Sequence, residues 1–531
     1  MASSATASAD TVATHPTYRA PVFTGLSDLI DGSAENRPGS PALIVTADRV
    51  PLSYSVLDGL VDDVAARLAD TGLRPGDPVG LVCANTVEFV AALLGAARAR
   101  LVTTPLDPAL PGPEVAARLD QLGARVLLTG PAAPTAPPEV SIPAWPVRVR
   151  VLPDGTATVT LDAGEAPAPQ GGGAAGELTD QDALVLFTAG TTGRSKMVPL
   201  THGNVAAGVT GVCRNYELEP SDGTVAVMPL FHGHGLFAGL LASLASGGRV
   251  VLPARGRFSA HTFWDDMRAA EATWFTAVPT IHQILLARAA QEYPGQESQP
   301  LRFARSCSAP LPEVTRQELE RLLGAPVLSA YGMTESTHQA TSEPLPQNSP
   351  RSPGSVGRAT DVGLRIVGAD GRECPPGDPG EVWVSGPHVA RGYLANPAET
   401  AHSFADGFFR TGDLGLLDTD GRLFLTGRIK NLINRGGEKI SPEHVEGVLA
   451  GCPGVVEVGV FPVPDATYGE RVGAAVVVGE GESTDSERIL EYCRGRLAPY
   501  EMPERLLVVD DLPHTAKGAL DRRALADRFA R

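Results

Sequence analysis

Short apolar runs and amphipathic helical stretches alternate along most of this chain, and this alternation limits the folds that it can adopt. Between residues 27 and 128 the helical pattern of Val56–Asp70 is followed by the strand-like run Pro78–Cys83, and the alternation resumes from Ala183. Strands separated by helices are typical of layered α/β domains. At 531 residues the chain also exceeds the roughly 300 residues that one hydrophobic core can serve. We therefore predict an α/β protein with at least two domains.

The later part of the chain changes character twice. Short β-like runs separated by glycine and proline between Ser355 and Leu425 predict a smaller, β-barrel-like subdomain, and the pattern from Ser441 onward predicts a compact α+β unit. Polar residues take over at Gly427–Asn431, where we predict a hinge. The expected organisation is a disordered tail over residues 1–26, a large N-terminal domain over 27–429 with layered α/β subdomains and the β-barrel-like subdomain, and a small mobile C-terminal domain over 430–531.

Charge and composition restrict the partners and the compartment. The formal net charge of −17 argues against nucleic acid and against anionic membrane surfaces, which are bound by clustered lysine and arginine. The longest apolar stretch, Leu236–Leu252, is interrupted by glycines and an arginine and is shorter than the roughly 20 residues of a spanning helix. The six cysteines are scattered and form no CxxC pair. We expect a cytoplasmic protein with neither a nucleic-acid nor a membrane partner.

A glycine- and threonine-rich run, TAGTTGRSK over residues 188–196, directly follows an apolar strand-like segment. Glycine lets successive backbone N–H groups turn toward an anion, while threonine hydroxyls and a lysine add donors and charge. An ordinary Gly/Thr turn is the simpler alternative, and the spacing differs from that of a Walker A loop. We predict a phosphate-binding loop, formed by Thr188, Gly190, Thr191, Thr192, Gly193 and Lys196, with Ala189 inside it.

Further motifs follow in order: YGMTE (331–335), GY (392–393), RTGD (410–413), GRIK (427–430) and RGG (435–437). With these motifs the chain resembles the adenylate-forming superfamily of acyl-CoA synthetases, adenylation domains and luciferases, from about residue 27 to the C-terminus. The stretches 229–236, 277–283 and 433–442 are most similar to the oxalate–CoA ligase branch. The resemblance places Tyr331 and Gly332 in the nucleotide-binding site.

Each of the remaining motif residues has a chemistry that fits a nucleotide. Thr334 can donate a hydroxyl to phosphate, and the neighbouring Glu335 suits a contact with Mg²⁺. Asp413 offers two acceptor oxygens for the ribose hydroxyls, and Arg428 can fork to ribose or phosphate. Taken singly, Asp413 could cap a turn and Arg428 could pair on the surface. Taken together, the ordered set favours catalysis.

The resemblance also implies roles around the hinge. Lys430 corresponds to the residue about which the C-terminal domain swings between its adenylating and thioester-forming arrangements. Gly436 and Gly437 correspond to the backbone that lines the pantetheine tunnel, where a thiol arm passes close to the chain. Thr334, Glu335, Arg428, Lys430 and Gly437 are the expected catalytic set.

Two histidines on either side of a glycine are the expected acyl pocket. By resemblance, His232, Gly233 and His234 lie near the acyl group, although a buried histidine is as often a hydrogen-bonded core residue. The oxalate–CoA ligase branch usually carries a branched residue at the position of Gly233, so we expect an enlarged pocket. A bulky acid and a small diacid both remain open.

The C-terminal segment PHTAKGAL (513–520) departs from the family pattern Pro-x-Thr-x-x-Gly-Lys. Aligned on Pro513, Thr515 and Gly518, the lysine that bridges carboxylate and α-phosphate during adenylation is replaced by Ala519. Such a donor is worth about 3 kcal/mol, or 10² to 10³ in rate. We favour an impaired adenylation half-reaction with thioester formation retained. The alternative is substitution by Lys517, which lies about 6 to 7 Å along an extended chain, on the same face.

The resemblance implies ATP or a preformed acyl-AMP, coenzyme A and Mg²⁺ as cofactors, and a small-molecule carboxylic acid or its adenylate as substrate. If adenylation is impaired, a separate adenylating ligase is an expected partner. Three other functions share the fold: loading of a carrier-protein thiol by a stand-alone adenylation enzyme, luciferase-type oxidation, and non-catalytic binding of acyl-AMP.

Overall fold

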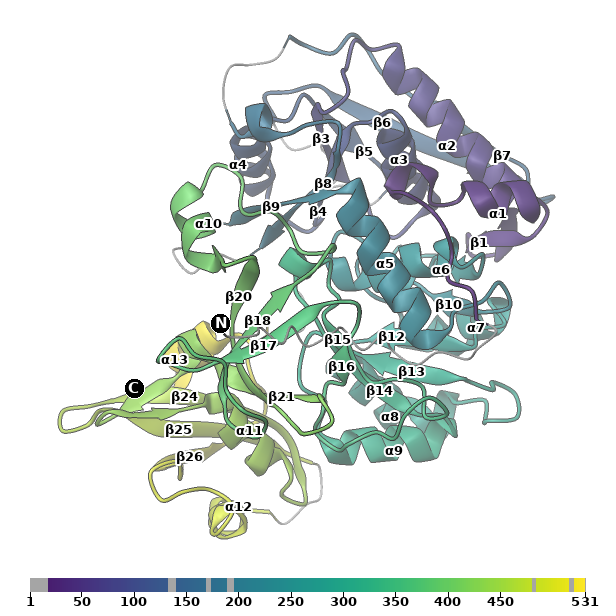
Figure 1. Ribbon diagram of the computed structural model, residues 1–531. Coiled ribbons are helices and arrows are strands. Elements are labelled where there is room, and N and C mark those ends of the chain that lie inside the picture. The colour runs from purple at the N-terminus through teal and green to yellow at the C-terminus, as the bar shows by residue number, and fades with distance from the viewer. Residues whose placement is uncertain are drawn as a thin grey trace, which may run out of the picture.

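The computed structural model describes residues 18–131, 140–168, 173–188, 195–479, 484–514 and 520–530. Figure 1 shows a large lobe that contains most of the chain and a smaller lobe, at the lower left, built from the C-terminal residues. The first 17 residues of the expected tail lie outside the described residues. Leu26, which opens the short turn η1 (Leu26–Asp28), is buried.

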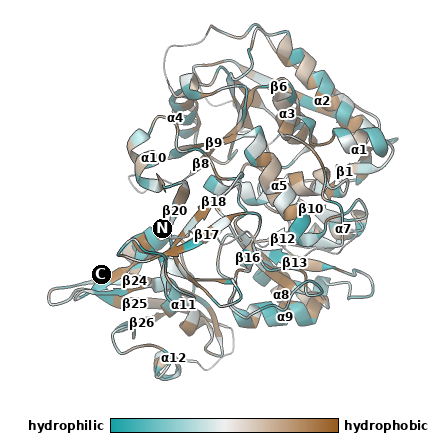
Figure 2. Ribbon diagram, viewed as in Figure 1, coloured by the Kyte–Doolittle hydropathy of each residue, from teal (hydrophilic) through white to brown (hydrophobic). Residues whose placement is uncertain are grey.

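A seven-stranded sheet forms the centre of the first α/β layer. Its central strands are parallel, apolar and buried along their whole length, as expected for strands covered by helices on both faces. In sheet order the strands are β7 (Ala157–Leu161), β6 (Ala144–Val151), β5 (Val126–Thr129), β3 (Pro78–Val82), β4 (Val102–Leu106), β8 (Asp182–Thr188) and β9 (Lys196–Thr201). The helices of this part are α1 (Asp31–Asn36), α2 (Tyr54–Ala69), α3 (Val87–Arg98) and α4 (Gly112–Leu122). Helix α3 is buried along almost its whole length and is drawn mainly in brown in Figure 2.

Two further sheets complete the layered region. One is β10 (Gly223–Val225), β11 (Arg249–Val251), β1 (Pro41–Val45) and β2 (Val50–Ser53). The other is β12 (Trp274–Ala277), β13 (Phe303–Ser306), β14 (Val327–Tyr331), β15 (Thr341–Ser342) and β16 (Arg358–Ala359). The associated helices and turns are η2 (Ala175–Glu177), α5 (His202–Tyr216), the π-helix η3 (His234–Leu241), α6 (Ala242–Ala245), α7 (Ala260–Ala269), α8 (Pro279–Glu292), α9 (Glu313–Leu323) and η4 (Thr334–Ser336).

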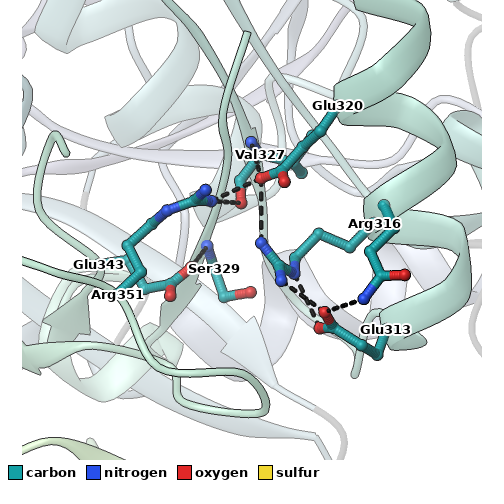
Figure 3. A network of polar contacts seen from close by, with 8 residues as sticks. Glu313, Arg316, Glu320, Val327, Ser329, Glu343 and Arg351 are labelled. Atoms are coloured by element: carbon teal, nitrogen blue, oxygen red, sulfur yellow. Dashed lines mark hydrogen bonds and ion pairs between the residues drawn. The ribbon is translucent and has the colours of Figure 1, made fainter.

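An ion-pair network ties helix α9 to strand β14, as Figure 3 shows. Arg316 and Arg351 both pair with Glu320, whose carboxylate also accepts the backbone N–H of Val327 at the start of β14. The buried carboxylate of Glu343 accepts the N–H of Ser329. Strand β14 is thereby fixed at both its beginning and its middle, and it ends at Tyr331, the first residue of the YGMTE motif.

A curled sheet follows and confirms the predicted β-barrel-like subdomain in the form of a half barrel. Its strands are β17 (Gly363–Val367), β18 (Gly380–Ser385), β20 (Phe408–Leu417) and β19 (Phe404–Ala405), with β21 (Leu423–Arg428) paired to β20; helix α10 (Pro397–Ser403) precedes β19. The fold is therefore the predicted one: layered α/β subdomains with a half barrel, followed by a small C-terminal α+β unit.

The C-terminal unit packs around hydrophobic clusters of its own. It contains η5 (Ile429–Asn431), β22 (Ile433–Arg435), β23 (Glu438–Ile440), α11 (Pro442–Ala450), β24 (Val455–Asp465), β25 (Gly469–Val478), α12 (Ser486–Cys493), β26 (Arg505–Val508) and α13 (Arg522–Phe529). Ser441 caps α11 by accepting the N–H of His444, and its hydroxyl donates to the carbonyl oxygen of Thr426 on β21 at 2.5 Å. A Cβ at Gly427 would lie 2.2 Å from the Ser441 Oγ, so only glycine fits beside this contact.

All six cysteines are free thiols. Within the described ranges, no helix combines the length and the apolar character that crossing a bilayer requires.

Candidate functional site

Two neighbouring strands hold the ends of the predicted phosphate loop. Thr188 is the last residue of β8, Lys196 is the first residue of β9, and the two are register partners in the antiparallel pair. The loop between them, with Ala189, Gly190, Thr191, Thr192 and Gly193, lies outside the described residues. Its predicted role stays a prediction, and the two flanking residues define where its ends lie.

Lys196 is held by a carboxylate that the sequence argument missed. Its Nζ pairs with Glu399 of α10 at 2.5 Å and lies 4.6 Å from the centre of the Tyr393 ring. The hydroxyl of Tyr393 donates to Glu335 Oε1 at 2.8 Å. Burial raises the pKa of Glu335, and the hydrogen bond from Tyr393 opposes that rise. Lys196, Tyr393 and Glu335, which come from three separate motifs, therefore form one connected group.

Just after β14, the backbone of the YGMTE segment at Gly332 packs closely against the backbone of His338. A Cβ at Gly332 would lie 2.4 Å from the carbonyl carbon of His338, so a side chain cannot be accommodated there. The chain then enters the turn η4, in which Thr334 is partly exposed and Glu335 is buried. Glycine is required here by close backbone approach rather than by an unusual dihedral angle.

Asp413, Tyr331 and Arg428 form a second polar group, which we call the ribose cluster after its predicted role. Asp413 on β20 is the register partner of Arg428 on β21, and its Oδ1 lies 2.5 Å from the Arg428 Nε. Tyr331 donates its hydroxyl to Asp413 Oδ2 at 2.6 Å. Burial raises the pKa of Asp413, and the charge of Arg428 opposes that rise most strongly. Asp413 is 3% exposed whereas the Arg428 side chain is 48% exposed, so the arginine is the partner that is able to move.

The predicted hinge and thiol-passage residues lie on consecutive turns. Lys430 belongs to η5, directly after β21, and burial, followed by the nearby Arg428, lowers its pKa. Gly436 and Gly437 form the turn between β22 and β23 with φ of +61° and +102°. Within the described part of the structure no atom lies within 4 Å of a Cβ built on Gly437. The backbone conformation, rather than crowding, requires glycine at this turn.

Three histidines gather at the start of the π-helix η3. The ring centres of His232 and His338 are 5.1 Å apart, and those of His234 and His338 are 5.6 Å apart. His234 is fully buried, with its Nδ1 3.0 Å from the Ser308 Oγ and its Nε2 2.6 Å from the Thr276 Oγ1. Two of these histidines are the ones expected from the sequence; the third, His338, was not expected and has a φ of +61°.

The expectation that Gly233 enlarges the acyl pocket is wrong. A Cβ at Gly233 would lie 2.9 Å from Cδ2 and 3.2 Å from Cβ of His338. The imidazole of His338 therefore occupies the space that a branched residue at position 233 would fill. The missing side chain at position 233 therefore opens no space beside His338.

A buried arginine, which was not expected from the sequence, lies near the histidines. Arg305 of β13 has no exposed surface; its guanidinium donates to Thr276 Oγ1 and to Gln339 Oε1, each at 3.2 Å. Among the residues that the structure describes, no carboxylate forms an ion pair with Arg305, and its Nε has no hydrogen-bond partner. A charged residue inside the apolar strand FARS was the signal available in the sequence.

The altered segment near the C-terminus is described only at its edges. His514 and Leu520 pair across it as an isolated bridge, and His514 contacts Glu457. Thr515, Lys517, Gly518 and Ala519 lie outside the described residues. The replacement of the family lysine by Ala519 therefore stays a feature of the sequence.

Two family models match the chain. The AMP-binding enzyme family matches residues 30–394, and the AMP-binding enzyme C-terminal domain matches residues 444–519. Together they contain the predicted phosphate loop, the YGMTE motif and most of the altered C-terminal segment.

Curated relatives and solved structures extend along nearly the whole chain. The oxalate–CoA ligase of Arabidopsis thaliana is 44% identical over 95% of this chain and 98% of its own length. The sulfoacetate–CoA ligase of Cupriavidus necator is 34% identical over 95% and 98% respectively. The crystal structure of ATP-bound MatB from Rhodopseudomonas palustris has a TM-score of 0.81 at 32% identity and covers 95% of this chain and 99% of that one. The chain thus belongs to the AMP-binding enzymes of the adenylate-forming superfamily and is an acid–thiol ligase of the acyl-CoA synthetase type.

Proposed function

We propose that this ligase carries out both half-reactions on one chain. In the first, a carboxylate attacks the α-phosphate of ATP, which gives an acyl-AMP and releases pyrophosphate. In the second, the thiol of coenzyme A attacks the acyl carbon, which gives the thioester and releases AMP. The observation that carries this proposal is the connected nucleotide side of the site: the ribose cluster, together with the linked Lys196, Tyr393 and Glu335.

The ribose cluster supports the nucleotide part of the proposal. Asp413 is buried and already accepts one hydroxyl, from Tyr331, so its second oxygen is the acceptor for the sugar once Arg428 moves. Arg428 is half exposed and would then be free to donate to ribose or phosphate oxygens. Thr334 and the predicted loop from Thr188 to Lys196 would hold the phosphates.

Glu335 fits a contact with Mg²⁺. One of its oxygens accepts from Tyr393, and the pair is buried beside Lys196, where the nucleotide phosphates would lie. Magnesium commonly takes one or two protein carboxylates and completes its octahedron with phosphate oxygens and water. When bound, the ion would neutralise the phosphates during attack by the acid.

We further propose that the acid is small and carries a second anionic group. Arg305, near the group formed by His232, His234 and His338, is a buried cation with which no carboxylate of the described residues forms an ion pair. A buried cation without a paired anion favours a ligand that brings the negative charge. The relatives named for oxalate and for sulfoacetate both use acids with two anionic groups, and this agrees with such a pocket. Oxalate is therefore the first acid to test.

A second candidate function is thioester formation alone, from an acyl-adenylate made by a separate adenylating ligase. The observation that favours it is Ala519 at the position of the family lysine. In the two-step proposal Lys517 provides the missing cation from two residues away.

Exchange of labelled pyrophosphate into ATP separates these two candidates. The native protein with oxalate should support exchange, and Lys517→Ala should reduce it by about 10² or more. Absence of exchange in the native protein, together with thioester formation from pre-made oxalyl-adenylate and coenzyme A, would establish the second candidate. In that case Ala519→Lys should restore exchange.

The thiol acceptor is tested separately. Coenzyme A and a phosphopantetheinylated carrier protein are offered in parallel with ATP and each acid of a panel, and the product is followed by mass. A strong preference for the carrier would contradict the coenzyme A proposal and would identify a carrier-loading enzyme. Binding of acyl-AMP without either thioester would identify a non-catalytic binder.

We also propose that the protein is cytoplasmic, as its scattered cysteines predict.

A further inference from the structure

One contact between the two lobes joins the start of helix α11 to the end of strand β21 (Figure 1). Ser441, which caps α11, donates its hydroxyl to the carbonyl oxygen of Thr426 at 2.5 Å. A Cβ built on Gly427 would lie 3.2 Å from the Glu443 Oε2, so the carboxylate of this glutamate reaches the backbone of β21. Glu443 is thus a charged side chain of the small lobe that lies at the boundary with the large one.

Three groups within the small lobe hold the Glu443 carboxylate in place. Asn431 donates its side-chain amide to Oε1 at 2.5 Å, and the Ser441 hydroxyl lies 3.2 Å from Oε2. The guanidinium of Arg522, at the start of α13, lies 3.2 Å from Oε1. Arg522 is itself fixed by two hydrogen bonds to Glu446, at 2.7 and 2.8 Å. The Glu443 side chain is 17% exposed, so its charge is held at one place at the lobe boundary.

Two cations at the predicted hinge lie within the electrostatic reach of Glu443. Burial would lower the pKa of Arg428, but nearby acidic groups, led by Asp413 and including Glu443, raise it. Burial lowers the pKa of Lys430, and the charge of Glu443 is among those that oppose this fall. Arg428 ends β21, and Lys430 follows it in η5. The attraction of Glu443 for these cations therefore acts across the hinge, and it weakens as α11 turns away from β21.

The surroundings of the predicted thiol-passage turn indicate which arrangement of the lobes this attraction favours. Within the described residues, a Cβ built on Gly436 meets Tyr468 of its own lobe, and one built on Gly437 meets no atom within 4 Å. Delivery of a thiol to the acyl group requires this turn to approach the large lobe. The lobes therefore stand in an arrangement that precedes thiol delivery.

We propose that Glu443 is a positioning residue that holds the small lobe against β21 for adenylation, through its attraction to Arg428 and Lys430. This attraction is broken when the lobe turns to deliver the thiol. Asn431 and Arg522 act by fixing the carboxylate. The inference rests on the proposed function, since it requires both half-reactions on one chain. Removing the charge should therefore change the balance between the half-reactions rather than the activity as a whole.

Glu443→Gln tests the proposal, because it removes the charge and keeps the shape of the side chain. Exchange of labelled pyrophosphate into ATP, with the acid that the native protein uses best, should fall about three- to five-fold, as for the loss of other partly exposed charge pairs. Thioester formation from the pre-made adenylate and coenzyme A should stay the same or rise. The ratio of exchange to thioester formation should thus fall by about three-fold or more.

Glu487→Gln is the matched control. It removes the same charge from an exposed position on α12 of the same lobe, and it should leave both rates as they are in the native protein.

A double-mutant cycle tests how the carboxylate is held. Asn431→Ala keeps the charge of Glu443 but removes one of the groups that fix it, so the ratio should shift in the same direction by a smaller factor. If Asn431 acts through Glu443, the variant carrying both Asn431→Ala and Glu443→Gln has the ratio of Glu443→Gln alone. Effects that multiply would overturn the positioning role of Asn431.

Limited digestion with trypsin reads the arrangement of the lobes without catalysis. Arg428 and Lys430 are both exposed trypsin sites at the hinge, and the fragments can be identified by mass. Cleavage at these sites should be about three-fold faster or more in Glu443→Gln than in the native protein or in Glu487→Gln, because cleavage follows the population of the released arrangement. Equal cleavage of the three proteins would contradict the proposal.

The outcomes separate this inference from the function beneath it. Equal changes of both half-reactions in Glu443→Gln, or no change in either, would overturn the inference, while exchange and thioester formation by the native protein uphold the proposed function. A native protein that supports no exchange with any acid, and forms thioester only from the pre-made adenylate, overturns the two-step function itself.

Discussion

The two sides of the site differ in how their charges are matched. On the nucleotide side Arg428 pairs with Asp413, and Lys196 pairs with Glu399. On the acyl side Arg305 lies beneath a group of histidines, and no carboxylate of the described structure neutralises it. A ligand on the first side must exchange partners with existing ion pairs, whereas a ligand on the second side supplies a charge that the protein lacks. Under the proposed function, the same fold would therefore bind two anionic substrates by different electrostatic means.

The largest expected effect comes from removing the negative charge that pairs with Arg428 in the ribose cluster. Asp413→Asn keeps the shape and the acceptor for Tyr331 but removes the charge that pairs with Arg428. Pyrophosphate exchange should fall by about 10² or more, as for the loss of other preorganised charges in active sites. The matched control is Asp420→Asn, in an ion pair with Arg422 at the β20–β21 turn, which should leave exchange unchanged. Equal losses in the two variants would show that the effect is structural.

A fall in pH should destabilise the acyl side of the protein more than the nucleotide side. Burial lowers the pKa of His282, which packs beside this region on α8, to about 4. The unfolded chain takes up this proton near pH 6.5, so the contribution is complete above pH 6.5 and is lost as the pH falls toward 4, by up to about 3 kcal/mol. Urea unfolding between pH 7 and pH 4.5 should show a shallower loss for His282→Gln than for the native protein. The exposed His261→Gln should follow the native slope, and a parallel slope for His282→Gln would refute the prediction.

Filling the acyl side tests how tightly it is packed. Gly233→Val should cost about 1–3 kcal/mol of unfolding free energy, because the new side chain overlaps the ring of His338. Adding His338→Ala removes the overlap, so the double variant should recover much of the loss. If Gly233→Val proves neutral on its own, the imidazole moves aside easily and the pocket is more adaptable than the contact distances indicate.

The smallest expected effect concerns the second ion pair of the nucleotide side. Glu399→Gln releases Lys196 from a partly exposed pair, which is worth about 0.5–1 kcal/mol. KM for ATP should therefore fall two- to five-fold, and the difference from the native protein should shrink at high salt. A rise in KM would show instead that Glu399 positions Lys196 for the phosphates.

Much of the fold follows from local pattern, because short apolar strands and amphipathic helices carry their period in the sequence. Asp413 and Arg428 are 15 residues apart on paired strands, and their motifs were enough to select them. Arg305, His338 and Glu399 were missed because their roles depend on segments brought together from distant parts of the chain. The error at Gly233 has the same cause: its missing side chain suggested space, and a histidine from another segment fills that space.

The hydroxyl of Ser441 has one more consequence for any rotation of the small lobe. It accepts from the first turn of α11, which moves with that lobe, and it donates to Thr426, which stays with the large one. Glu443 Oε2 already lies 3.2 Å from the same hydroxyl. If the small lobe turns as the family resemblance implies, the Ser441 hydroxyl can donate to Glu443, which moves with it. One hydrogen bond is then replaced by another, and the start of α11 stays capped.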